Sequence, residues 1–179
     1  MQATLTMAIR NIITPENPLL RKKALRVTDF GSGFQTLVDD MVETMLDAPG
    51  VGLAAPQVAV PQRLFVARLP DDEEAKKEYG KLAGVVFVFA NPELVKVSKE
   101  KVEGVEACLS IPGYAGKVDR YERIVIKGQD RQGKEFRMKA DGWLARVFQH
   151  ELDHLEGKLY IDIANEVWEH KPDEEQVAE

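Results

Sequence analysis

The segment FQHELDHLEG, residues 148–157, contains two histidines four residues apart and a glutamate directly after the first one. On an α-helix this spacing places His150 and His154 on one face, where both imidazoles can bind the same metal ion. Glu151 lies beside them and could serve as the base for that metal site. The pattern therefore predicts a catalytic metal site. The alternative is an ordinary charged helix that carries two surface histidines.

The neighbouring residues support a helix with one buried face. In ADGWLARVFQHELDHLEG, residues 140–157, apolar side chains recur at helical spacing, and Gly157 is suited to end the helix. At about 100° per residue, the two histidines fall at the edge of the apolar stripe and Glu151 lies between them and the stripe. Partial burial of this carboxylate would raise its pKa toward the range useful for proton transfer.

A catalytic metal site needs three protein ligands and one open position, so a third ligand must come from elsewhere. The candidates are His170, Glu156, Glu166, Glu169 and Cys108, the last of which lies in VEACLSIPG. Chemistry alone favours the thiolate of Cys108 but does not decide among them. If the ligand is a downstream carboxylate, the chain resembles a metallopeptidase, for which Cys108 would be dispensable.

The rest of the chain indicates the elements that position these residues. Apolar spacing predicts a helix over residues 33–46, and the charged run 71–81 predicts an exposed loop or a short helix. Strands are expected at 64–69, at 85–92, which ends at a turn in Ala-Asn-Pro, at 93–98 and at 123–130. A hairpin turn at 130–133 and a returning strand at 134–140 follow. This order predicts an α+β fold: a single domain with an antiparallel or mixed β-sheet around a central metal-binding helix. We expect a catalytic domain over residues 1–165 and an acidic, flexible C-terminal tail over 166–179.

Composition limits the partners. The 179 residues are 44% hydrophobic and 30% charged, and the net charge of −6 argues against direct binding of nucleic acid. No apolar run approaches the roughly 20 residues of a membrane span, and no signal or transit pattern is seen. These features predict a cytoplasmic protein without a membrane contact. Cys108 is the only cysteine, so no internal disulfide can form.

Three blocks, in this order, resemble the peptide deformylases, which remove the formyl group from N-formylmethionine on new polypeptides. The blocks are GVGLAAPQ (50–57), EACLS (106–110) and QHELDHLEG (149–157), and the resemblance extends from about Pro18 to Asp162. It implies that Cys108, His150 and His154 hold the metal and that Glu151 is the general base and acid. The metal it implies is Fe²⁺, with zinc, nickel or cobalt able to substitute.

The resemblance also assigns residues to the substrate, an N-formylmethionyl peptide. It implies that Gln57 and the backbone N–H of Leu109 polarise the formyl carbonyl, and that Gly52 offers its backbone to the peptide. An apolar pocket for the methionine side chain should have Val51 and Val147 as wall residues.

Two departures from the family pattern stand out. Ala107 replaces the usual glycine of the second block, which would cause strain if its φ were positive. The C-terminal segment is short and acidic, so contact with a translating ribosome would not run through a basic C-terminal helix. A non-catalytic homologue would lack a ligand or the base, and this chain carries the full set.

Overall fold

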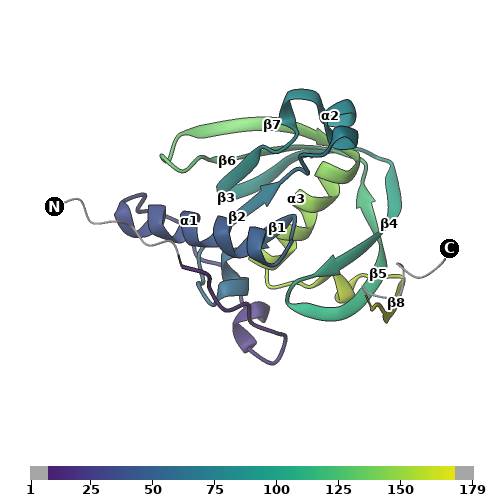
Figure 1. Ribbon diagram of the computed structural model, residues 1–179, viewed down its shortest axis with the longest axis horizontal. Helices are drawn as coiled ribbons and strands as arrows, with labels where there is room; N and C mark the ends of the chain where they lie inside the picture. The colour runs from purple at the N-terminus through teal and green to yellow at the C-terminus, as the bar shows by residue number, and fades with distance from the viewer. Residues whose placement is uncertain (1–7, 172–179) are drawn as a thin grey trace.

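Two antiparallel sheets and three α-helices make up the described part of the protein (Figure 1). The computed structural model describes residues 8–171. The larger sheet has the order β1-β2-β3-β6-β7, with strands Gly52–Ala54, Leu64–Arg68, Val86–Val97, Arg123–Gln129 and Glu135–Asp141. The smaller has the order β4-β5-β8, with strands Lys101–Cys108, Ile111–Tyr121 and Glu166–Glu169.

Helix α3 (Gly142–Leu155) connects the two sheets. It packs against β1, β2, β6 and β7 of the larger sheet and against β5 of the smaller one (Figure 1). Its apolar face lies in a core with Phe65 and Phe89, and the Phe148 ring packs against both, with centroids 5.8 and 5.0 Å away. The predicted α+β domain around a central helix is confirmed.

The other helices agree with the sequence. Helix α1 (Ser32–Asp47) matches the expected helix over 33–46 and covers β1 and β2 with the apolar side chains of a second core. The charged run contains the short helix α2 (Glu73–Tyr79). Short 3-10 helices are η1 (Pro18–Arg21), η2 (Ala55–Val58), η3 (Gly80–Leu82) and η4 (Tyr160–Asp162). No helix within residues 8–171 is both long and apolar enough to cross a membrane.

Strand β3 corrects one prediction. The sequence suggested two strands separated by a turn at Asn91-Pro92, but the structure has one strand of 12 residues. Asn91 adopts a φ of 51°, and the register to β6 shifts between Ala90 and Glu93, so the Asn-Pro pair forms a β-bulge. The Asn91 side chain holds the bulge by accepting from the Val27 N–H at 2.8 Å and donating to the Val27 carbonyl at 2.9 Å.

The smaller sheet was not predicted. Residues 101–121 form a long β4–β5 hairpin that carries Cys108 at the end of its first strand. Residues 166–169, which the sequence placed in a C-terminal tail, form β8 and pair with β5. Residues 172–179 lie outside the described part of the chain.

Candidate active site

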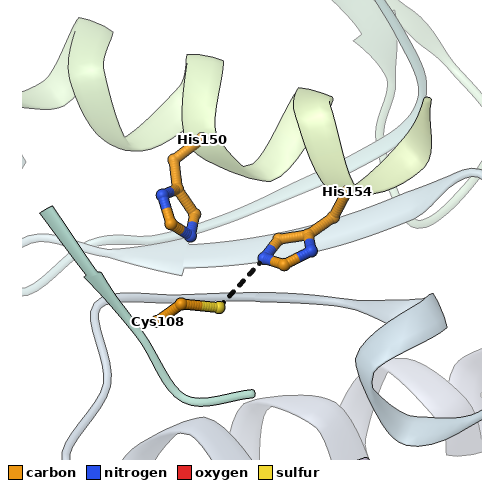
Figure 2. A group of neighbouring side chains, drawn as sticks. All are labelled: Cys108, His150 and His154. Atoms are coloured by element: carbon orange, nitrogen blue, oxygen red, sulfur yellow. Dashed lines mark hydrogen bonds between the residues drawn. The ribbon is translucent and has the colours of Figure 1, made fainter. Parts of the chain in front are cut away.

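The three expected metal ligands converge from two elements. Cys108 comes from the end of β4, while His150 and His154 project from α3 toward it (Figure 2). Their ligand atoms all lie within 4.8 Å of one another, and Cys108 Sγ is 3.3 Å from His154 Nε2. Within residues 8–171 this is the one group of three or more such side chains with converging ligand atoms. A thiolate and two imidazoles fit a metal that keeps one position open.

The other candidates for the third ligand, Glu156, Glu166, Glu169 and His170, do not belong to this converging group. Glu156 forms ion pairs with Arg63 and, at 3.1 Å, with Lys23. The backbone N–H of His170 donates to the Gly113 carbonyl at 2.8 Å, and His170 is one of the residues that line the cavity described below.

Glu106 holds the imidazole of His150. Its Oε2 is 2.8 Å from His150 Nδ1, which leaves Nε2 of that ring for a metal. Arg120 donates to both carboxylate oxygens, at 2.8 and 2.9 Å, and also pairs with Asp153 at 2.6 Å. Burial alone would raise the pKa of Glu106, but the hydrogen bonds from Arg120 and His150 lower it to about 2.

The two histidines differ in their preference for a proton. Burial alone would lower the pKa of His150, but the neighbouring Cys108 and Glu106 raise it well above its usual value. Burial, followed by the charge on His150, lowers the pKa of His154 well below its usual value. Acidic groups that favour a proton on His150 also favour a metal cation there, while His154 is kept in the neutral form that binds metals.

The Glu151 carboxylate lies near the ligands, and its hydrogen-bonding capacity is not filled. Its side chain is 4% exposed, and Oε2 has no hydrogen-bond partner among the described residues. Burial, the largest influence, raises its pKa to about 7. The carboxylate packs directly on the Cα of Gly52, so a β-carbon at residue 52 would collide with it. Glu151 is therefore buried on α3, next in sequence to His150 and against Gly52 of β1.

Gln57 and Leu109 come from different elements and both lie close to Cys108. Gln57, in η2, accepts from the Ala54 N–H at 2.9 Å and donates from Nε2 to Ser110 Oγ at 3.1 Å. The same Nε2 lies 3.6 Å from Cys108 Sγ. Leu109 follows Cys108, and its side chain fills the space where a side chain on Gly50 would lie, 2.7 Å from that β-carbon position. The two glycines of the first block therefore provide room for Leu109 and Glu151.

These residues border a cavity of about 360 Å³. The predicted site residues that line it are Val51, Gly52, Gln57, Cys108, Leu109, Val147, His150 and Glu151. His154 is 1% exposed and is not part of the lining. Trp143 and Tyr114 add aromatic surface to the lining. The cavity lies between β1, an edge of the larger sheet, and β4, an edge of the smaller one.

Two further details concern the second block. Ala107 lies in β4, and within residues 8–171 the non-glycine residues with positive φ are Ala59 and Asn91. The alanine is therefore unstrained. Glu106 was missed because β4 was not predicted. Its position two residues before Cys108 is the signal that could have found it, since alternate residues of a strand share a face.

A thiolate, two imidazoles and a buried carboxylate at one cavity define a metallohydrolase, a metal-dependent hydrolytic enzyme. The model of the polypeptide deformylase family matches residues 9–169. The chain is 48% identical over 156 residues to the peptide deformylase of Dehalococcoides mccartyi strain CBDB1, covering 87% of this chain and 86% of that one.

Two solved structures are similar over most of their length. A peptide deformylase from Legionella pneumophila has a TM-score of 0.77 at 42% identity, covering 88% of this chain and 87% of that one. A Met-Ala-Ser-bound class I type b enzyme from Acinetobacter baumannii has a TM-score of 0.80 at 30% identity, with 88% and 99% covered. The chain belongs to the polypeptide deformylase family. Its activity is that of the family, removal of the N-formyl group from nascent peptides.

Proposed function

We propose that Cys108, His150 and His154 hold one divalent metal ion and that Glu151 transfers the proton during deformylation. The convergence of the three ligand atoms within 4.8 Å carries this proposal. When bound, the metal supplies a Lewis acid that lowers the pKa of water and polarises the formyl oxygen. We assign Fe²⁺ as the metal, with zinc, nickel or cobalt able to substitute.

Glu151 is suited to move a proton in both directions. With a pKa of about 7, its carboxylate can accept a proton from the attacking water near neutral pH. The water oxygen bonds to the formyl carbon, and the C–N bond then breaks. Glu151 returns the proton to the leaving amine, so the products are formate and a free N-terminus. The unpaired Oε2, buried next to the ligands, is the atom that we assign to this transfer.

Gln57 and Leu109 would stabilise the negative charge that develops on the formyl oxygen. The Gln57 amide is fixed by Ala54 and Ser110, so it loses little orientational freedom when the reaction occurs. The backbone N–H of Leu109 would supply the second donor. A donor of this kind is typically worth about 3–4 kcal/mol of transition-state stabilisation.

The cavity suits an N-terminal methionine whose peptide continues as a strand. Val51 and Val147 would contact the methionine side chain, and the Gly52 backbone would bind the peptide main chain. Because β1 and β4 are both edge strands beside the cavity, an extended peptide could pair with one or both. The Met-Ala-Ser peptide named for the Acinetobacter baumannii structure supports this substrate class.

Release of formate from formyl-Met-Ala-Ser under anaerobic conditions tests this function. We expect one formate and one free Met-Ala-Ser per turnover, with no cleavage of internal peptide bonds. Cleavage of internal bonds without formate release would instead support a metallopeptidase.

Two variants test the third ligand. Cys108→Ser should lose its metal on dialysis, because a hydroxyl is a much weaker ligand than a thiolate. His170→Ala should retain its metal, since that residue lies outside the converging group. Loss of metal from the His170 variant, with retention by the Cys108 variant, would refute the ligand set.

The choice of iron has its own test. Iron-loaded protein should be the more active form and should lose activity in air as the mass increases through oxidation of Cys108. Zinc has no redox chemistry, so zinc-loaded protein should remain stable. Equal and lasting activity of the two forms, with Cys108 unmodified, would contradict the assignment of iron.

We place the enzyme in the cytoplasm, where formylated chains would be made, and expect contact with the translating ribosome. Such contact would not use a basic C-terminal helix, because the C-terminal segment is acidic. Co-sedimentation with translating ribosomes would test it.

A further inference from the structure

Arg146 has no role in the proposed mechanism, although it is largely buried beside the metal ligands. It lies on α3, its side chain is 13% exposed, and its guanidinium contacts both strands of the β4–β5 hairpin. Nη1 donates to the Val118 carbonyl at 2.8 Å, and Nη2 donates to the Val102 carbonyl at 2.6 Å. Nη1 also donates to Glu106 Oε1 at 3.0 Å. One side chain therefore ties the histidine-bearing helix to the cysteine-bearing hairpin.

Gly104 makes this contact possible. A β-carbon at residue 104 would lie 2.6 Å from Cζ, 2.7 Å from Nη2 and 2.8 Å from Nε of Arg146. Such distances require the guanidinium to move. Gly104 has no positive φ, so its backbone could accept alanine without strain. The glycine is needed at this position for space.

The contact reaches the metal site through Glu106. Its Oε1 accepts from Arg120 Nε and Arg146 Nη1, while Oε2 accepts from Arg120 Nη2 and lies 2.8 Å from His150 Nδ1. Four contacts use the full acceptor capacity of a carboxylate. Displacement of Arg146 would free one of these positions and loosen the hairpin that carries both Glu106 and Cys108.

We propose that Arg146, seated on Gly104, is a positioning residue for the metal site. It holds β4 against α3 so that Cys108 and Glu106 meet the two histidines in a fixed geometry. This inference rests on the proposed metal-binding function. A second account of Arg146 makes the opposite prediction: if the residue acted mainly through its charge, removal of a cation near the site would tighten the binding of another cation.

The experiment uses cobalt as the metal and compares Arg146→Met, Gly104→Ala and the double variant with the wild type. Arg146→Met removes the charge and keeps much of the apolar stem, while Gly104→Ala displaces the guanidinium and keeps its charge. The readouts are cobalt affinity measured by competition with a chelator and the absorption of the cobalt–thiolate bond. Each single variant should bind cobalt about tenfold more weakly, at the low end for a residue that supports a ligand indirectly. Gly104→Ala should have no added effect when Arg146 is already Met.

Gln149→Leu is the matched control. Gln149 also joins α3 to β5, through bonds of 3.0 and 2.9 Å to the Tyr121 N–H and carbonyl, but it does not contact Glu106. This variant should lower the unfolding midpoint of the metal-free protein and leave cobalt affinity within about twofold of wild type.

Four results would overturn the proposal. They are unchanged cobalt affinity in the Arg146 and Gly104 variants, tighter cobalt binding by Arg146→Met, an undiminished effect of Gly104→Ala in the double variant, and equal weakening by Gln149→Leu. Failure of the proposed function would be distinguishable, because wild-type protein would then bind no cobalt through Cys108. If the wild type binds one cobalt and the Arg146 and Gly104 variants bind it equally well, only the positioning role is refuted.

Discussion

Two buried glutamates near the metal ligands show how one residue type can serve two purposes. Glu106, on β4, and Glu151, on α3, are 6% and 4% exposed, so burial alone would raise the pKa of both. Glu106 is surrounded by donors, and its pKa falls to about 2, whereas Glu151 has an unpaired oxygen and its pKa rises to about 7. Donors keep Glu106 permanently charged as a support for His150. Their scarcity around Glu151 leaves that carboxylate free to exchange a proton.

The largest expected effect comes from Glu151→Gln. This change keeps the size of the side chain and removes the proton carrier, so kcat should fall by at least about 100-fold. Metal content should be unchanged, because the ligands are intact. Steady-state kinetics and metal analysis on the same preparation check both parts. Retention of more than a tenth of wild-type kcat would rule out the proton-transfer role.

Glu106→Gln should show the opposite pattern. The amide cannot accept the same set of hydrogen bonds, so His150 loses its orienting charge and metal affinity should fall by about 10–100-fold. At saturating metal, kcat should recover much more than in the Glu151 variant. A variant with normal metal affinity would mean that Arg120 and Glu106 serve packing alone.

The two carboxylates should also make opposite contributions to the pH dependence of stability in metal-free protein. The lowered pKa of Glu106 adds stability above pH 4.5, which is lost as pH falls toward 2. The raised pKa of Glu151 means that the folded state holds a proton that the unfolded state releases, so stability falls as pH rises from 4.5 to about 7. At about 1.4 kcal/mol per pKa unit, the second change amounts to about 3 kcal/mol.

Urea unfolding of wild type and Glu151→Gln, with chelator present, measures this second contribution. The difference in unfolding free energy between the two proteins should change by about 3 kcal/mol between pH 4.5 and 7.5. A difference that is constant across this range would show that Glu151 is not proton-bound in the folded state.

The smallest effect is expected from Ala107→Gly, a substitution in β4 between Glu106 and Cys108. Ala107 has an extended backbone and an exposed side chain, so Ala107→Gly should lower stability by about 0.5–1 kcal/mol through backbone entropy. Its kcat should stay within about twofold of wild type. A large gain in activity would show instead that the methyl group obstructs the cavity.

The histidine helix was predictable because its information is local. His150, Glu151 and His154 lie within five residues, and the apolar period around them fixes which side of the helix is buried. Strand β4 carries the reverse pattern: Glu106 is buried, whereas Val102 and Val105 are 46% and 60% exposed. A search for alternating apolar residues cannot find a strand whose valines are exposed while one of its charged side chains is buried.

Contacts between distant residues were equally hidden from the sequence. Glu106 is charge-balanced by Arg120, Arg146 and His150, which lie 14, 40 and 44 positions away. The Asn91-Pro92 pair suggested a turn, whereas the structure has a bulge there. The bulge is held by hydrogen bonds to Val27, 64 positions away, which the local sequence does not reveal. The family blocks identified the ligands, but the groups that orient those ligands required the fold.

The contact between Gly52 and Glu151 has a genetic consequence. Any side chain at residue 52 would displace the carboxylate that packs on its Cα. Mutations in the codons for residues 52 and 151 should therefore have similar effects on function. A screen for loss of function should recover substitutions at both codons, including the change of Gly52 to alanine. A second-site suppressor would have to move the helix backbone away from β1, which no single codon change near either residue is expected to achieve.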